Sequence, residues 1–300
     1  MKENFYSRKS VLIAVVFAML LSAMFAGEAA AKKDSEKNKA QAGHANVITE
    51  MVPMRDGVKL AADIDIPKNA SGKLPTLLVR SPYGRKLGDI SQIVRSFIGS
   101  RYVIMSQDTR GRGGSEGENI PFLTDQDDGF DTVEWIAKQP WSDGRVAMVG
   151  GSALAITAYQ AAIAKPPHLT CILAVVAPAN IQSQALLWGG QLRQDLAIGW
   201  TVGTDYPVEA LTPMTDHPQT DDFSKKYDVA HNAPGINVPM FHVGGWFDIF
   251  TQGTIDAYNS LQNNGAPGAR GMQRLIIGPW THVGEVSAKQ GQLEFPSNAN

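Results

Sequence analysis

One stretch near the middle of the chain combines an apolar strand, a pair of glycines and an apolar helix: Arg145-Val146-Ala147-Met148-Val149-Gly150-Gly151-Ser152-Ala153-Leu154-Ala155-Ile156-Thr157-Ala158. The strand covers 145–149, and the helix, made of small and apolar residues, continues to Ala164. A short strand that is apolar throughout is typical of a parallel sheet buried on both faces. The stretch therefore predicts a strand–turn–helix unit with a serine at the turn.

Strands and helices alternate on both sides of this unit. Asp56-Gly57 separates two alternating runs, 47–54 and 58–66, and this pattern predicts a β-hairpin. Further strands are expected at 74–80, 102–106, 171–176, 238–243 and 274–277, and further helices at 87–100, 131–138 and 251–263. The order predicts one α/β domain over 46–300, with a mostly parallel sheet flanked by helices. The alternation stops from about 180 to 235, which indicates a lid inserted over one edge of the sheet.

The composition excludes several classes of protein. The 300 residues carry 27 basic and 29 acidic side chains, and this near balance argues against a nucleic-acid partner. A hydrophobic content of 43% with 19% charged residues is typical of a globular chain. The single cysteine, Cys171, excludes an intramolecular disulfide and a four-cysteine metal site. It lies in an apolar run and is expected to be buried. We expect no metal and no cofactor.

The first residues have the three parts of a secretory signal peptide. A basic start with Lys2, Arg8 and Lys9 precedes an apolar stretch over 11–26, and small residues follow up to Ala31. The apolar stretch is shorter than the roughly 20 residues that span a membrane, although an uncleaved anchor is the alternative. We expect a signal peptide over 1–31, a mobile leader over 32–45, a secreted or periplasmic protein, and no stable membrane association.

Two serines compete for the role of a nucleophile. Ser115 matches Gly-x-Ser-x-Gly letter for letter, whereas Leu154 replaces the last glycine after Ser152. The motif works because its serine stands on a sharp turn between a buried strand and a helix. Ser152 has that context and Ser115 does not, so Ser152 is the predicted nucleophile. At such a turn the backbone N–H of the next residue, Ala153, faces the oxygen that becomes negative during acyl transfer.

A serine hydroxyl needs an imidazole to take its proton and a carboxylate to orient that imidazole. His282 follows the strand 274–277, on a loop past its carboxyl end, where open α/β sheets collect ligands. His242 lies inside a strand and is expected to be a core residue. Asp248 follows the strand 238–243 and is the predicted acid; we expect Gly244-Gly245 to turn the chain there and Trp246-Phe247 to shield the carboxylate.

Two acidic or glycine-rich motifs carry no predicted site. The run 125–129 resembles a calcium loop, but Ile136 stands where a bidentate glutamate is required. Its acids are expected instead to favour the start of the following helix. The glycines of 111–116 fail the dinucleotide pattern, because Glu116 takes the last place and no helix follows.

Several segments together resemble the cocaine-esterase type of serine hydrolase, a family grouped with X-Pro dipeptidyl-peptidases, α-amino-acid ester hydrolases and glutaryl acylases. They are Arg55-Asp56-Gly57-Val58-Lys59-Leu60, Ser81-Pro82-Tyr83-Gly84, Gln107-Asp108-Thr109-Arg110-Gly111-Arg112-Gly113-Gly114-Ser115-Glu116-Gly117, Trp135-Ile136, Gln139-Pro140-Trp141-Ser142-Asp143-Gly144-Arg145-Val146, Gly244-Gly245-Trp246-Phe247-Asp248 and Gly278-Pro279-Trp280-Thr281-His282.

This resemblance implies an α/β-hydrolase fold with a short helical lid and a triad of Ser152, Asp248 and His282. It also implies that the Tyr83 hydroxyl completes the oxyanion hole, and that the loop 108–117 is structural. The chain departs from the family at Ala153, where an aromatic residue is usual, and at Ala155, where a glycine is usual.

The family's C-terminal β-sandwich is also expected to be absent, because eighteen residues follow His282. The chain is therefore either a compact relative or a fragment. We expect a secreted serine hydrolase that cleaves esters, amides or short peptides through an acyl-enzyme.

Two alternatives stay open. One is an X-Pro dipeptidyl-peptidase type of aminopeptidase, in which Asp221, Asp222 or Asp228 of the lid would hold the free amino terminus of the substrate. The other is a truncated, non-catalytic member that acts in binding.

Overall fold

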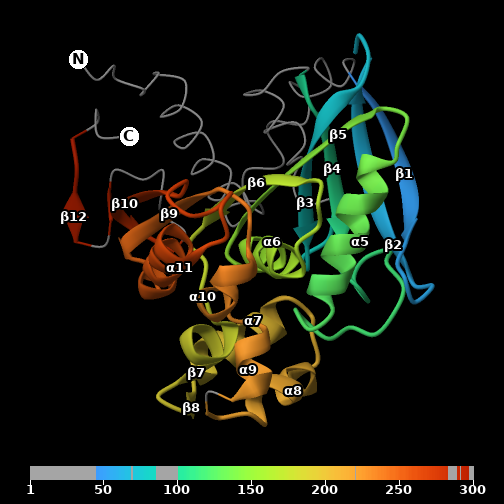
Figure 1. Cartoon of the computed structure of the whole chain (residues 1–300). Helices are drawn as coiled ribbons and strands as arrows, with labels where there is room; N and C mark the ends of the chain where they lie inside the picture. The colour runs from blue at the N-terminus through green and yellow to red at the C-terminus, as the bar shows by residue number, and fades with distance from the viewer. Residues whose placement is uncertain are drawn as a thin grey trace, which may run out of the picture.

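An eight-stranded sheet runs through the molecule in the order β1-β2-β4-β3-β5-β6-β9-β10 (Figure 1). Its strands from β3 to β10 pair in parallel, and only β1 and β2 are antiparallel additions at one edge. The sequence prediction of a mostly parallel sheet is thus confirmed. The strands are β1 (Ala45–Pro53), β2 (Lys59–Pro67), β3 (Leu74–Ser81), β4 (Val103–Asp108), β5 (Ser142–Gly151), β6 (Leu169–Val175), β9 (Met240–Phe247) and β10 (Arg274–Thr281).

The structure, a computed structural model, describes residues 45–68, 70–85, 101–219, 221–282, 289–290 and 292–296. The predicted signal peptide over 1–31, the leader over 32–45 except Ala45, and the helix predicted over 87–100 lie outside these residues. Among the described residues, no helix has the length and apolarity needed to cross a membrane.

Three long helices pack against the sheet: α5 (Asp125–Ala137), α6 (Ala153–Ala164) and α11 (Thr251–Asn264). Helix α6 lies against β3, β5 and β6, and it has the same bounds as the predicted helix. Its residues from Ala153 to Ile163 are all buried, which explains why its sequence is apolar on every side. The strand–turn–helix unit predicted from the central stretch is therefore present, with its helix buried along nearly its whole length.

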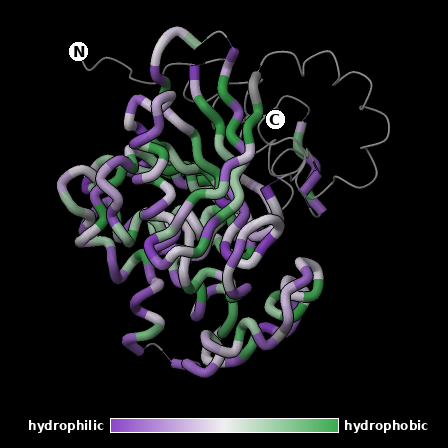
Figure 2. The backbone as a smooth tube through the Cα atoms, turned by 90° about the vertical axis from the view of Figure 1, so that its right-hand side faces the viewer, coloured by the Kyte–Doolittle hydropathy of each residue, from purple (hydrophilic) through white to green (hydrophobic). Residues whose placement is uncertain are grey.

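The hydrophobic core lies between these helices and the sheet, and Figure 2 shows hydrophobic stretches along neighbouring strands. Cys171 is an exception to the prediction. It is exposed, because alternation along β6 places it on the face opposite to the buried Ile172. The apolar sequence of β6 therefore does not show that one face of this strand is buried more completely than the other.

The segment predicted as a lid holds short helices and no strand of the eight-stranded sheet, and most of these helices lie at the bottom of Figure 1. They are π-helix η3 (Gln182–Leu186), α7 (Gln194–Gly203), η4 (Val208–Leu211), α8 (Thr212–Thr215), α9 (Asp222–Lys226), α10 (Val229–Asn232) and η5 (Ala233–Gly235), with a strand pair β7 (Leu187–Trp188) and β8 (Gln191–Leu192). A second pair, β11 (Lys289–Gln290) and β12 (Leu293–Glu294), follows β10. The lid packs onto the first turn of α6 through its own cluster of apolar side chains.

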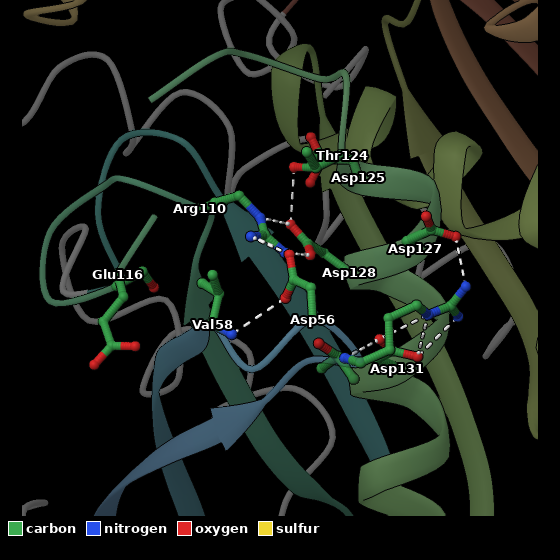
Figure 3. A network of polar contacts seen from close by, with 12 residues as sticks. Asp56, Val58, Arg110, Glu116, Thr124, Asp125, Asp127, Asp128 and Asp131 are labelled. Carbon is green, nitrogen blue, oxygen red and sulfur yellow. Dashed lines mark hydrogen bonds and ion pairs between the residues drawn. The ribbon is translucent and has the colours of Figure 1, made fainter. Parts of the chain in front are cut away.

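Buried ion pairs hold the start of α5, which begins six residues before the predicted position. Arg110 binds Asp128 at 2.6 Å and Asp56 at 2.8 Å, and so joins the β1–β2 hairpin to α5 (Figure 3). Asp125 and Asp128 are buried. As predicted, acids of this run lie in the first turn of α5, and two of them, Asp125 and Asp128, also neutralise arginines inside the protein.

Arg80 of β3 is the other arginine of this network and is 0% exposed. Its guanidinium binds Asp125 at 2.6 Å and Gln107 at 2.8 Å. Burial raises the pKa of Asp125, while the charge of Arg80 opposes that rise. Arg80 thus favours the ionised form of Asp125 against the effect of burial.

We predict that Arg80→Met lowers the free energy of unfolding by about 3–5 kcal/mol, because it leaves the buried carboxylate of Asp125 without its cation. Urea unfolding followed by circular dichroism measures this. Arg145→Met is the matched control, since the Arg145–Asp143 pair lies at the surface and its loss should leave the midpoint nearly unchanged. Equal midpoints for both variants would contradict the prediction.

His242 of β9 is a core histidine, as its sequence context predicts. It is 0% exposed; its Nδ1 meets the Tyr159 hydroxyl at 2.9 Å and its Nε2 meets Gln273 Oε1 at 3.2 Å. An amide oxygen only accepts, so Nε2 carries the hydrogen and Nδ1 accepts from the tyrosine. Burial lowers the pKa of His242 to about 4, and the ring stays neutral at physiological pH.

This neutral histidine makes stability depend on pH. Its folded pKa lies below its unfolded value, so its contribution is complete above about pH 6.5 and is lost as the pH falls towards 4. We predict that the stability advantage of wild type over His242→Gln shrinks by about 3 kcal/mol over that range. Urea unfolding at several pH values measures it, with the exposed His231→Gln as control. A constant advantage would refute the prediction.

Candidate functional site

Ser152 lies on a strained turn between β5 and α6. Its φ of 55° and ψ of −123° are unfavourable for a residue with a side chain. The backbone N–H of Ser152 is held by the carbonyl of Val175, at 2.9 Å. A Cβ on Gly150 would lie 2.3 Å from the carbonyl carbon of Leu154, so only glycine fits there. The turn has thus formed with Ala153 and Ala155 in place of the family's usual residues.

The side chains of Ser152, Asp248 and His282 meet past the carboxyl ends of three strands. His282 Nδ1 lies 2.5 Å from Asp248 Oδ1, and its Nε2 lies 2.9 Å from Ser152 Oγ. An ionised carboxylate only accepts hydrogen bonds, so Nδ1 carries the hydrogen and Nε2 is left to accept the serine proton. The Asp248 side chain is 0% exposed and that of His282 is 18% exposed, so water barely competes with the pair.

The surroundings of Asp248 differ from the prediction in two respects. Trp246 and Phe247 are 61% and 51% exposed, so they do not cover the carboxylate. Phe250 instead packs edge-on against the His282 ring, at 5.1 Å between centroids. The glycine pair does not turn the chain either, because β9 continues through it to Phe247. Gly245 instead lets β9 approach β10, since a Cβ there would lie 2.1 Å from the carbonyl oxygen of Trp280.

The predicted oxyanion hole contains two hydrogen-bond donors. The Tyr83 hydroxyl, just after β3, accepts a hydrogen bond from Trp200 Nε1 at 3.0 Å. Burial raises the pKa of Tyr83, so the hydroxyl keeps its proton at neutral pH. Ala153 is the first residue of α6, and N–H groups in the first turn of a helix have no carbonyl partner within the helix.

Ser115, the exact match to the sequence motif, is occupied by structural bonds. Its Oγ donates to the carbonyl of Asp108 and accepts the N–H of Ala61, both at 2.9 Å. Asp108 also binds Arg85 and the N–H of Gly114. These contacts tie the loop 108–117 to the sheet, as the family resemblance implied.

The remaining histidines of the described chain lie away from Ser152. His168 pairs with Glu134 at 2.9 Å, and His217 pairs with Asp221 at 2.5 Å inside the lid. The described residues hold no group of three or more His, Cys, Asp or Glu side chains that could bind a metal ion.

A cavity of about 290 Å³ opens between the lid and the serine. Its walls are almost wholly apolar, with Ser152, His282, Tyr83 and the exposed Asp195 as its polar residues. The apolar walls come from Phe122, Ala153, Ile156, Ile181, Ala185, Leu186, Leu196, Ala197, Gly199, Trp200, Leu211 and Phe250. The sequence analysis did not predict the members of this list that come from the lid, which lie between Ile181 and Leu211. No local pattern shows which face of a short helix will turn towards the sheet.

None of the lid acids predicted to bind an amino terminus lines this cavity. Asp221 caps α9 and pairs with His217, and Asp228 caps α10. Asp222 is fully exposed and pairs with Lys225. Asp195, in the first turn of α7, is the one acid among the described residues of the cavity wall.

Comparison with known proteins agrees with this architecture. The family described as X-Pro dipeptidyl-peptidase (S15 family) matches residues 56–213 and 203–284. A cocaine esterase from Rhodococcus sp. (strain MB1 Bresler) is 30% identical over 285 residues, which cover 77% of this chain and 48% of the esterase.

Solved structures have the same α/β-hydrolase fold. An aminopeptidase from a marine sediment archaeon, Thaumarchaeota archaeon, is similar with a TM-score of 0.70 and 25% identity, over 85% of this chain and 52% of that protein. An α-amino acid ester hydrolase has a TM-score of 0.67 and 22% identity, over 84% of this chain and 51% of its own. This chain therefore spans about half the length of the esterase and of these two structures.

Proposed function

The chain belongs to the X-Pro dipeptidyl-peptidase family S15, and we propose that it is a serine hydrolase that cleaves ester or amide bonds through an acyl-enzyme. The observation that supports this most is the His282 imidazole, which lies within hydrogen-bond distance of both Asp248 and Ser152. In this proposal Ser152 is the nucleophile, His282 the general base and Asp248 the acid that orients the imidazole.

The reaction has two halves. Ser152 Oγ attacks the carbonyl carbon of the substrate and gives its proton to His282 Nε2. The carbonyl oxygen becomes negative and is stabilised by the Tyr83 hydroxyl and the N–H of Ala153. The protonated imidazole then gives its proton to the leaving oxygen or nitrogen, which departs and leaves an ester on Ser152. Water, activated by His282, hydrolyses that ester and restores the serine.

The cavity wall is almost wholly apolar, so we propose that the part of the substrate next to the scissile bond is an uncharged, apolar acyl group. Removing such a group from water gives roughly 25 cal/mol for each Å² of apolar surface buried, whereas a charge placed among Phe122, Ile156 and Leu211 would have no partner. We therefore propose esters of short apolar acids as the first substrates to be tested.

We predict that wild type reacts with a fluorophosphonate probe at Ser152 and hydrolyses p-nitrophenyl esters of short fatty acids. Ser152→Ala should abolish labelling and reduce turnover by about 10⁶-fold, because the three residues act as a unit. Mass spectrometry of the labelled peptide identifies the serine, and Ser115→Ala is the control that should keep both properties. A folded wild type that resists labelling would instead favour the non-catalytic, binding alternative.

An aminopeptidase is the second candidate, and the place of Asp195 favours it. This carboxylate lines the cavity from α7, and it could hold the ammonium group of a substrate with a free amino terminus. An aminopeptidase among the structures of similar fold supports the same candidate. The two candidates share Ser152, Asp248 and His282 and differ in what binds at the cavity mouth.

If the protein is an aminopeptidase, we predict that replacing Asp195 changes KM for one class of substrate and not for another. Asp195→Asn would raise KM for an X-Pro amide and leave KM for a p-nitrophenyl ester unchanged, because only the amide carries a positive charge. Steady-state kinetics on both substrates measure this, with the exposed Asp222→Asn as matched control. Wild type that hydrolyses the ester and leaves X-Pro amides intact would exclude the aminopeptidase.

A further inference from the structure

A hydrogen bond joins the lid to the catalytic tyrosine. Trp200 of α7 points its Nε1 at the Tyr83 hydroxyl oxygen, 3.0 Å away, and the two rings meet edge to face at 6.3 Å. An indole N–H is a donor only, so the tyrosine oxygen is the acceptor in this bond. The single hydrogen of the hydroxyl must therefore point elsewhere, and Tyr83 lines the same cavity as Ser152.

Aromatic stacking fixes the orientation of the Trp200 ring. Two rings stack on it: Phe122, at 5.6 Å and an interplanar angle of 30°, and Tyr206, at 5.0 Å and 22°. These two contacts restrict rotation of the indole and favour the orientation in which its N–H points at Tyr83. An apolar cavity wall requires only that the Trp200 ring be present. It does not require that the indole N–H point in one direction, as it does here.

Arg112 ties the two partners of the bond together. Its guanidinium donates to the carbonyl of Pro82, at 2.8 Å, and to the carbonyls of Thr204 and Asp205 just past α7. It also lies over the Tyr206 ring, at 4.3 Å. Pro82 precedes Tyr83, so one side chain from the loop 108–117 sets the distance between the segment of the tyrosine and the lid helix that carries Trp200.

The fixed direction of the Trp200 N–H matters for the proposed oxyanion hole. The Tyr83 hydroxyl can rotate, and it stabilises a developing negative charge only when its hydrogen faces that charge. A donor fixed on the opposite side leaves that orientation as the favoured one. It also polarises the O–H bond, because a hydroxyl that accepts a hydrogen bond becomes a better donor.

We propose, on the basis of the function proposed above, that Trp200 is a positioning residue of the oxyanion hole. Its indole N–H orients the Tyr83 hydroxyl towards the acyl oxygen, and the hole is complete only when α7 of the lid is in place. The effect belongs to the transition state, since the negative oxygen exists only there. It should therefore act on kcat and leave KM nearly unchanged.

A double-mutant cycle tests the proposal. Trp200→Phe removes the N–H and keeps an aromatic ring to stack with Phe122 and Tyr206, and Tyr83→Phe removes the hydroxyl. With a p-nitrophenyl ester, Tyr83→Phe should lower kcat roughly 10²–10³-fold and Trp200→Phe roughly 5–20-fold. In the Tyr83→Phe background, Trp200→Phe should cause no further loss, because the N–H acts only through the hydroxyl. Trp188→Phe, on an exposed tryptophan of the lid, is the matched control and should change nothing.

Each result either supports or overturns the role of Trp200. An equal loss from Trp200→Phe in both backgrounds, or a loss confined to KM, would show that the ring acts by packing alone and would overturn the role of Trp200. An unchanged kcat would overturn it as well. Labelling of Ser152 by a fluorophosphonate is followed in parallel: wild type without labelling and turnover would overturn the proposed hydrolase itself, and the role of Trp200 with it. Thermal unfolding of each variant confirms that the fold persists.

Discussion

The strained backbone at Ser152 is the constraint on which the described site depends. A positive φ at a residue with a side chain costs on the order of 1–3 kcal/mol, and it persists only where the surroundings leave no alternative. Here the buried helix α6 and the parallel strand β6 leave the Ser152 backbone no alternative conformation. The carbonyl of Val175 holds the N–H of Ser152, and the absent side chain of Gly150 lets Leu154 come close. The strain therefore directs the serine hydroxyl away from the core and towards His282.

The parallel sheet explains why distant residues meet. Strands β5, β9 and β10 run in one direction, so the residues that follow them all lie at the same rim. Asp248 and His282 reach Ser152 from different parts of the sequence because they leave neighbouring strands at similar heights. The antiparallel hairpin β1–β2 and helix α5 both contribute to the main hydrophobic core, and the ion pairs of Arg80 and Arg110 with acids of α5 add to that packing.

The lid contributes more than a cover to this rim. Its apolar cluster shares Ala153 and Ile156 with α6, so the residue next to Ser152 packs against lid side chains. The loop 108–117, which resembles a hydrolase motif in its letters, anchors both the sheet and the end of α7 instead. The loop 108–117 thereby sets the position of the end of α7 relative to the sheet.

The sequence by itself determined the α/β alternation, the bounds of α6, the choice of Ser152 over Ser115 by context, and the residues Asp248, His282 and Tyr83 as candidates. These follow from local rules, since an apolar strand, a small-residue turn and a buried helix each leave a pattern within a few residues. Only the tertiary structure decided that α5 starts at Asp125, that Cys171 and Trp246 are exposed, and that Asp195 and Trp200 face the cavity. Each of these depends on contacts between segments far apart in the chain, such as Arg80 with Asp125 and Trp200 with Tyr83, and no periodicity along the sequence records such contacts.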